Sequence, residues 1–274
     1  MNYTTAYKEV KRLLKVGGTN TGDSIETVES KVREKYIDLL VKTILCSMYP
    51  DPALAYGSDD KNHRIEGRDW PGVAHSMIGQ YRAQNIVELC KRIIHEQIPG
   101  DFLEAGVWRG GTCILMRGIL EAYGIKDRKV FCADSFEGLP PPDEDKYPHD
   151  KGDILHTFEQ LAVSLETVQK NFKLYDLYDE QTIFLKGWFK DTMPTISKET
   201  FSLIRLDGDM YESTMDVLNN LYDRVSVGGF IVVDDYALPS CKVAVEDFRR
   251  QRNIIDEIHN IDWTGIWWQK TMAD

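Results

Sequence analysis

The chain has 274 residues, of which 42% are hydrophobic and 28% charged, a composition typical of a globular protein with a sizeable core. Its net charge of −11 argues against nucleic acid or an anionic membrane as a partner and is compatible with a bound cation. The five cysteines are widely spaced, so neither a disulfide framework nor a zinc cluster is expected. No signal peptide pattern or membrane-spanning apolar run is visible, and we therefore expect a cytoplasmic protein.

The N-terminal part of the chain is predicted to be helical, because hydrophobic residues recur there at helical spacing. Helices are expected over residues 24–48 and 76–97, with a weaker amphipathic segment at 4–15. Residues 51–72 are polar and turn-rich, which predicts a long loop. We expect residues 1–98 to form a helical N-terminal cap that contributes to the substrate pocket.

From residue 99 onward, short apolar segments alternate with amphipathic ones, as in a parallel sheet covered by helices on both faces. Strands are expected at 101–105, 129–133, 181–185, 201–206 and 229–233, and helices at 112–123, 156–173, 212–224 and 239–252. Two final strand-like runs, 257–261 and 265–269, predict an antiparallel edge. The sequence therefore predicts an α/β fold, with a Rossmann-like sheet and an antiparallel final strand over residues 99–274.

The segment Leu103–Thr112 (LEAGVWRGGT) is typical of the turn between a strand and a helix. Its glycines at 106, 110 and 111 let the backbone bend and let a ligand lie close to it. Their spacing differs from the dinucleotide pattern G-x-G-x-x-G, which disfavours a nicotinamide oxidoreductase and favours a nucleoside-like ligand without a required pyrophosphate. The alternative is an ordinary strand-to-helix turn.

Two further strand ends carry residues suited to a nucleoside. Asp134 follows the strand at 129–133, where a carboxylate can accept hydrogen bonds from both hydroxyls of a ribose. The segment Lys186–Phe189, which includes Gly187 and Trp188, can lay an aromatic face near a purine. The alternatives are that Asp134 caps a turn and that Trp188 belongs to the core.

Paired carboxylates follow the next two strands: Asp207 and Asp209 after 201–206, and Asp234 and Asp235 after 229–233. Like charges at one sheet edge repel each other, and a hard divalent cation bound by oxygen ligands relieves this repulsion. We therefore predict a metal site formed by Asp207, Asp234 and Asp235. The alternative is that one aspartate caps a helix and another pairs with Arg205 or Lys186.

The acidic, proline-rich loop 136–153 lies beside the same edge and is interpreted either as a lid that excludes water or as a solvated surface loop. His149 and His156 are each more simply surface residues than catalytic bases. Trp263, Trp267 and Trp268 are most simply explained by sheet packing or an oligomer surface.

A ribose-binding aspartate beside a carboxylate-bound cation, without a pyrophosphate turn, indicates S-adenosylmethionine as the cofactor. The cation can hold an acceptor hydroxyl and lower its pKa, while a carboxylate takes its proton. Methyl transfer is then an in-line displacement helped mainly by positioning.

Four ordered motifs resemble those of the macrocin/mycinamicin O-methyltransferase family, whose relatives include the novobiocin sugar methyltransferase. They are Glu104–Thr112 (EAGVWRGGT), Ala133–Pro140 (ADSFEGLP), Leu206–Thr214 (LDGDMYEST) and Val227–Tyr236 (VGGFIVVDDY). Gly67–Pro71 (GRDWP) and Ala74–Gly79 (AHSMIG) are also similar to that family. The resemblance covers roughly residues 60–270, and no clear motif match is visible in the first 60 residues, which help to shape acceptor pockets in the family.

The resemblance implies a class I S-adenosylmethionine-dependent methyltransferase fold and Mg²⁺-dependent methylation of a deoxysugar hydroxyl on a glycosylated natural product of antibiotic biosynthesis. It also implies a homo-oligomer, either a dimer or a tetramer. Asp207, Asp234 and Asp235 carry over as metal ligands, with Asp207 also the favoured base. The cofactor residues expected from the patterns and the resemblance together are Met77, Ile78, Glu104, Ala105, Gly106, Gly110, Gly111, Thr112, Asp134, Ser135, Gly187 and Trp188.

Two other functions remain as alternatives. A metal-dependent catechol or phenol O-methyltransferase would use the same kind of site, with a carboxylate-bound metal beside the cofactor. The long insert at 51–72 and the family motifs count against this alternative. A non-catalytic nucleoside-binding protein needs no trio of metal aspartates, so their presence argues against this alternative.

Overall fold

The computed structural model describes residues 25–54 and 60–272. The chain divides into two compact units, Met1–Lys35 and Tyr36–Asp274, and helix α2 (Ile25–Ile44) runs through the boundary between them. The amphipathic segment expected at residues 4–15 lies outside the described residues. The division of the chain into a cap of residues 1–98 and a second domain stays a prediction.

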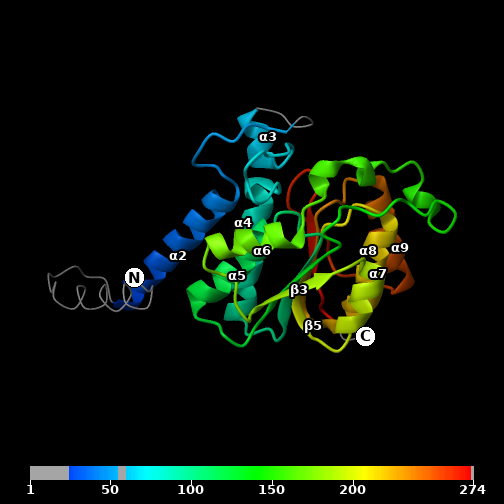
Figure 1. Ribbon diagram of the computed structural model, residues 1–274. Coiled ribbons are helices and arrows are strands. Elements are labelled where there is room, and N and C mark those ends of the chain that lie inside the picture. The colour runs from blue at the N-terminus through cyan, green and yellow to red at the C-terminus, as the bar shows by residue number, and fades with distance from the viewer. Residues whose placement is uncertain (1–24, 55–59, 273–274) are drawn as a thin grey trace. The chain divides into compact units, whose positions relative to one another are not determined.

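This unit contains a seven-stranded sheet in the order β3-β2-β1-β4-β5-β7-β6 (Figure 1). The strands are β1 (Asp101–Ala105), β2 (Val130–Asp134), β3 (Thr182–Lys186), β4 (Phe201–Leu206), β5 (Val225–Val233), β6 (His259–Asn260) and β7 (Ile266–Gln269). Strands β1 to β5 pair in parallel, and β7 pairs antiparallel with β5 and β6. The predicted α/β sheet with an antiparallel end is thus confirmed.

The register brings the carboxyl ends of the central strands level with one another. Ala105, at the end of β1, lies opposite Ala133 of β2 on one side and Leu206 of β4 on the other. Leu206 in turn lies opposite Val233 of β5. The residues that follow these strands therefore emerge side by side at one edge of the sheet, where open α/β folds bind ligands.

Helices cover both faces of the sheet (Figure 1). The helices of this unit that follow α2 are α3 (Lys61–Glu66), which packs on α4, and α4 (Gly79–His95), α5 (Gly111–Tyr123), α6 (Leu165–Leu174), α7 (Phe189–Thr192), α8 (Tyr211–Leu221) and α9 (Pro239–Gln251), with short 3₁₀ turns between them. Successive strand residues point to opposite faces, so Phe102 packs with α4 and α5 while Leu103 packs with α8 and α9. The helices in the described ranges do not combine the length and apolar character needed to cross a bilayer.

Two predicted segments differ from the structure. The loop expected at 51–72 contains α3, because Asp60 caps its first turn by accepting a hydrogen bond from the backbone N–H of Asn62 and Gly67 ends it in the left-handed conformation. The helix expected at 156–173 begins only at Leu165, where Ser164 is the N-cap. The residues before Ser164 form two single 3₁₀ turns, Leu155–Thr157 and Glu159–Leu161.

The long loop between β2 and α6 is anchored at its centre by a buried carboxylate. Asp150 accepts hydrogen bonds from the backbone N–H groups of Tyr211 (2.6 Å) and Glu212 (3.0 Å), the first residues of α8. These N–H groups have no partner within the helix, so a residue 61 positions away supplies the cap of α8. The loop is therefore tied to the segment that follows β4.

Replacing Asp150 by alanine is expected to lower the free energy of unfolding by about 1–2 kcal/mol, the usual cost of losing a helix cap. Urea unfolding of the purified protein measures this difference. The matched control is Asp143→Ala in the same loop, because the Asp143 carboxylate accepts a hydrogen bond from within the loop, from the N–H of Lys146 (3.1 Å). Equal stability of the Asp150 and Asp143 variants would contradict the assigned anchor.

Candidate active site

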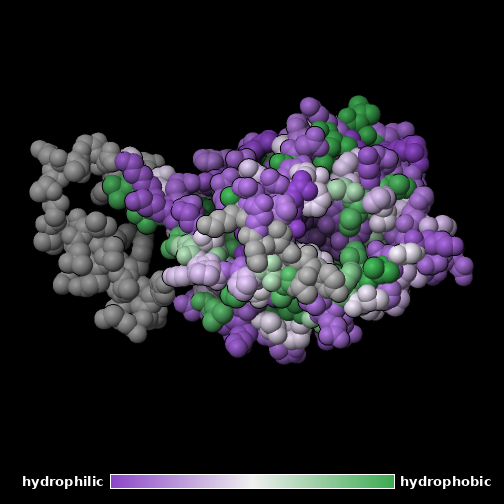
Figure 2. All heavy atoms as spheres, turned by 90° about the horizontal axis from the view of Figure 1, so that it is seen from above, coloured by the Kyte–Doolittle hydropathy of each residue, from purple (hydrophilic) through white to green (hydrophobic). Residues whose placement is uncertain are grey.

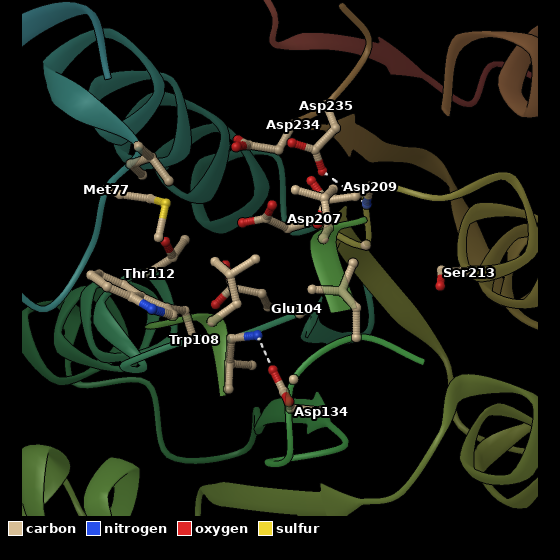
Figure 3. A pocket seen from close by; sticks show the side chains of 18 of the residues that line it. Met77, Glu104, Trp108, Thr112, Asp134, Asp207, Asp209, Ser213, Asp234 and Asp235 are labelled. Atoms are coloured by element: carbon tan, nitrogen blue, oxygen red, sulfur yellow. Dashed lines mark hydrogen bonds between the residues drawn. The ribbon is translucent and has the colours of Figure 1, made fainter. Parts of the chain in front are cut away.

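A cavity of about 320 Å³ opens at the carboxyl ends of β1, β2, β4 and β5. Figure 2 looks down on this side of the protein, and Figure 3 shows the side chains that line the cavity. Asp134 lies at one end of the close-up, and Asp207, Asp209, Asp234 and Asp235 gather at the other. Both groups are expected at this edge from the sequence, and the structure places them around one cavity.

The glycine turn after β1 is packed directly against the segment after β4. Gly106 has φ +90°, and a Cβ atom there would lie 1.8 Å from the backbone oxygen of Asp207. Only glycine fits this position, because both the backbone conformation and the contact exclude a side chain. The turn that is expected to carry the cofactor is thereby held next to the acidic cluster.

Asp134 joins the glycine turn to the segment after β2. Its carboxylate accepts hydrogen bonds from the backbone N–H groups of Val107 (2.8 Å; Figure 3) and Phe136 (2.7 Å). Burial raises the pKa of this carboxyl, and the hydrogen bonds counteract the rise. Asp134 therefore caps a turn, as the alternative reading expected, and also lines the cavity. The Ser135 hydroxyl (3.4 Å) and the N–H of Trp108 also donate to this carboxylate, so ribose hydroxyls would share its about four acceptor sites with the turn.

The other predicted cofactor residues fall into two groups. Those that line the cavity are Met77, Ile78, Glu104, Gly106, Thr112, Ser135, Gly187 and Trp188. Ala105, Gly110 and Gly111 are not among the lining residues. A Cβ on Gly111 would lie 2.4 Å from the backbone oxygen of His75, so this glycine permits close packing of α5 against the segment before α4.

The three predicted metal ligands come together at the ends of β4 and β5. One carboxylate oxygen from each of Asp207, Asp234 and Asp235 lies within 4.8 Å of the others. Asp209 extends the group, because its backbone N–H donates to the carboxylate of Asp235 (3.2 Å; Figure 3). An all-oxygen set of this kind suits a hard divalent cation such as Mg²⁺.

Two buried arginines form ion pairs with carboxylates of this cluster. Arg205 of β4 forms ion pairs with Glu104 of β1, with Asp207 (2.8 Å) and with Asp234. Arg82 of α4 pairs with the other oxygen of Asp234 and with Asp262 (3.0 Å). The pairing of Asp207 with Arg205 was expected as an alternative to a metal, and here it coexists with the clustered carboxylates.

Negative charge remains in excess after this pairing. Six carboxyl groups belong to the network, whereas Arg82 and Arg205 supply two positive charges; the carboxyl groups are those of Glu104, Asp207, Asp209, Asp234, Asp235 and Asp262. Burial and the neighbouring Asp207 raise the pKa of Asp209 to about 8, and burial with Asp209 raises that of Asp235. The residues therefore fit a bound divalent cation, which would offset the remaining charge.

Sequence reasoning missed several residues of this site. Arg82 and Trp263 carry no local signal, because their partners lie far away in the chain; Arg82 contacts Asp234, 152 positions away. The sequence assigns Trp263 to sheet packing or an oligomer surface, whereas the structure places it on the cavity wall. His149 stacks on Tyr211 with ring centroids 5.1 Å apart, and neither it nor His156 lines the cavity.

This sheet order, with an antiparallel β7, a glycine turn after β1 and a carboxylate after β2, defines a class I S-adenosylmethionine-dependent methyltransferase. The family model described as "Macrocin-O-methyltransferase (TylF)" matches residues 51–270. The chain belongs to this family and is an S-adenosylmethionine-dependent O-methyltransferase.

Named relatives agree with this assignment. The chain is 50% identical over 244 residues to a demethyldecarbamoylnovobiocin O-methyltransferase of Streptomyces niveus, covering 86% of this chain and 93% of the relative. It is 45% identical over 246 residues to a mycinamicin III 3''-O-methyltransferase of Micromonospora griseorubida, covering 87% and 97%. The structure of the O-methyltransferase NovP superposes with a TM-score of 0.85 at 50% identity, covering 88% of this chain and all of that one.

The crowded carboxylates predict an unusual pH dependence in the metal-free protein. The pKa of Asp209 rises from 3.8 to about 8 on folding, so between these values the folded protein binds more protons than the unfolded one. The free energy of unfolding must then fall as the pH rises through this window. In EDTA, we expect the melting temperature to drop between about pH 6 and about pH 8.5, and the drop to be smaller in Asp209→Asn.

Differential scanning calorimetry measures both melting temperatures. Asp223→Asn is the control, because this exposed carboxylate pairs with Arg252 away from the cavity lining. A pH profile of Asp209→Asn that runs parallel to that of the wild type would show that Asp209 does not carry the effect.

Proposed function

We propose that this enzyme methylates a sugar hydroxyl of a glycosylated natural product and that it does so with a divalent cation, Mg²⁺ being the first choice. The observation that carries the proposal is the all-oxygen cluster of Asp207, Asp234 and Asp235 next to the glycine turn. The names of the relatives support a sugar acceptor: one acts on a demethyldecarbamoylnovobiocin, one on mycinamicin III at a 3'' position, and one on a rhamnosyl tetracenomycin.

The residues around Asp134 are proposed to hold the nucleoside end of the cofactor. Asp134 would accept the ribose hydroxyls, with Ser135 beside it, and Gly187 and Trp188 would border the purine. The turn that begins at Glu104 would receive the methionine end, together with Thr112 and the segment Met77–Ile78. Of the predicted cofactor residues, all but Ala105, Gly110 and Gly111 line the cavity.

Asp207 is proposed as the general base. Its position is fixed twice, because its backbone abuts Gly106 and its carboxylate pairs with Arg205 (2.8 Å). Burial raises its pKa, which makes the carboxylate a stronger proton acceptor. S-adenosylmethionine supplies a methyl group on a sulfonium for in-line displacement by an oxygen, and a divalent cation supplies positive charge that favours loss of the hydroxyl proton. Asp207 would take that proton.

The nature of the acceptor can be tested with a small panel. Demethyldecarbamoylnovobiocin, mycinamicin III and a demethylated rhamnosyl tetracenomycin represent glycosides, and a simple catechol represents the alternative function. Transfer of a radiolabelled methyl group to at least one glycoside, and not to the catechol, is the expected result. Methylation of the catechol alone would overturn the proposed acceptor class. The homo-oligomer implied by the family resemblance also stays a prediction, which light scattering of the purified protein can check.

Replacing Asp207 by asparagine tests the proposed base. We expect turnover of the best glycoside to fall by about 10²–10⁴-fold, because the amide cannot accept the proton. Calorimetric titration should show that S-adenosylmethionine still binds within about threefold of the wild-type affinity, a factor worth well under 1 kcal/mol. Asp223→Asn serves as the control. Turnover near the wild-type level in Asp207→Asn would exclude Asp207 as the base.

Chelation tests the metal. We expect EDTA to abolish turnover and added Mg²⁺ to restore it, and Mg²⁺ to raise the melting temperature more at about pH 8.5, where more cluster carboxylates are ionised, than at about pH 6. Asp235→Asn should raise the Mg²⁺ concentration needed for half-maximal turnover by about tenfold or more. Full turnover in EDTA would remove the metal from the proposal and leave the S-adenosylmethionine assignment in place.

A further inference from the structure

Trp263 stands on the wall between the active-site cavity and a second, shallower pocket. It lines both, and the second pocket is completed by Glu66, Arg68, Tyr81, Ile261 and Asp262. Trp263 belongs to the turn between β6 and β7, whereas Glu66 and Arg68 lie at the end of α3. The two pockets are therefore neighbours with a shared aromatic wall.

The indole of Trp263 is fixed although it is 44% exposed. Its ring N–H donates to the backbone oxygen of Glu66 (2.9 Å), and the guanidinium carbon of Arg68 lies 4.3 Å from the ring centroid. A large ring that is exposed and already ordered loses little conformational freedom when a ligand packs against it. These contacts favour a binding role for Trp263.

Both chain neighbours of Trp263 connect it to the acidic cluster. Asp262 pairs with Arg82 (3.0 Å), which also pairs with Asp234. Thr264 donates its hydroxyl to the backbone oxygen of Asp234 (2.9 Å). The position of Trp263 is therefore set relative to the carboxylates where the acceptor hydroxyl is expected to react.

The chemistry of the second pocket favours an uncharged ring. Its charges are already paired, because Arg68 bonds to Glu66 (2.6 Å) and Asp262 to Arg82. Its exposed side chains include the aromatic rings of Trp263 and Tyr81, the latter 49% exposed. Aromatic rings with satisfied charges around them bind apolar or planar groups better than ions.

Another group of residues in the cavity lining offers the opposite chemistry: Lys190, Glu212 and Asp216. The pKa of Asp216 is raised to about 6 by burial and by Glu212, so these acidic groups lie close together. An apolar ring system leaving the active site gains less contact with apolar surface among these charged groups than beside Trp263.

We propose that Trp263, with Arg68 and Tyr81, forms an aglycone subsite: it binds the uncharged ring system to which the methylated sugar is attached. This inference rests on the proposed function, because it requires a glycoside at the acidic cluster. The sugar places its hydroxyl at Asp207, and the remainder of the acceptor extends over Trp263 into the second pocket. Trp263 would be a specificity residue and not a catalytic one.

The test compares two acceptors that differ only in the aglycone: the best glycoside of the panel, and the methyl glycoside of the same sugar. In Trp263→Ala, we expect KM for the full glycoside to rise about tenfold or more while kcat stays within about twofold. KM for the methyl glycoside and the affinity for S-adenosylmethionine should not change. Trp263→Phe should recover part of the loss.

Tyr178→Ala is the matched control, because Tyr178 is an aromatic side chain of similar exposure (42%) that lines neither pocket, and it should leave KM for the full glycoside unchanged. The melting temperature of Trp263→Ala shows whether this variant folds. If it does not, Tyr81→Ala and Arg68→Ala are tested in its place. An equal KM effect on both acceptors, no effect on either, or a selective effect of Tyr178→Ala as large as that of Trp263→Ala would overturn the subsite. If the wild type methylates no glycoside, both the proposed function and the subsite are wrong. If the wild type methylates a glycoside and the Trp263→Ala variant behaves like the wild type, only the subsite is wrong.

Discussion

Charge pairing beneath the cavity is the constraint around which this site is built. Arg205 is completely buried in the middle of the sheet and bridges carboxylates from three successive strands in space, those of Glu104, Asp207 and Asp234. Desolvation of such groups usually cancels much of their attraction, so this arrangement adds little to net stability. Removal of a single partner is different, because an unpaired buried charge costs about 3–5 kcal/mol. The network therefore fixes the geometry of the carboxylates more than it strengthens the fold.

The same network joins parts of the protein that are distant in sequence. Arg82 contacts Asp234, Asp262 and, through a hydrogen bond of 2.8 Å, the backbone oxygen of Gly67 at the end of α3. The segment before α4, the acidic cluster and the turn between β6 and β7 thus share one guanidinium group. The glycine turn joins this assembly through the contact of Gly106 with Asp207. The predicted cofactor residues, the proposed metal ligands and the wall formed by Trp263 are consequently positioned by a common set of buried contacts.

The sequence predicts much of this architecture because the signals are local. The alternation of apolar strands and amphipathic helices identified the five parallel strands to within a few residues, and the strand ends indicated Asp134, Asp207, Asp234 and Asp235 as neighbours. Arg82, Asp150 and Trp263 escaped prediction because their roles depend on partners 61 to 197 positions away. Helix α3 was missed although Asp60 and Gly67 are suitable caps, since its six residues are too few to show a clear hydrophobic period. Local patterns define elements, whereas long-range polar contacts are visible only in the folded chain.

The cap that Asp150 places on α8 also occupies backbone donors that could otherwise bind an anion. A helix N-terminus that opens toward a cavity normally attracts phosphate, because its free N–H groups and dipole favour anions. Here the first N–H groups of α8 are already bonded to a carboxylate of the protein itself. A phosphate group would therefore find the N–H groups of Tyr211 and Glu212 already occupied. These two donors tie down the loop instead of serving a ligand, so the start of α8 differs in this respect from an ordinary anion-binding helix N-terminus.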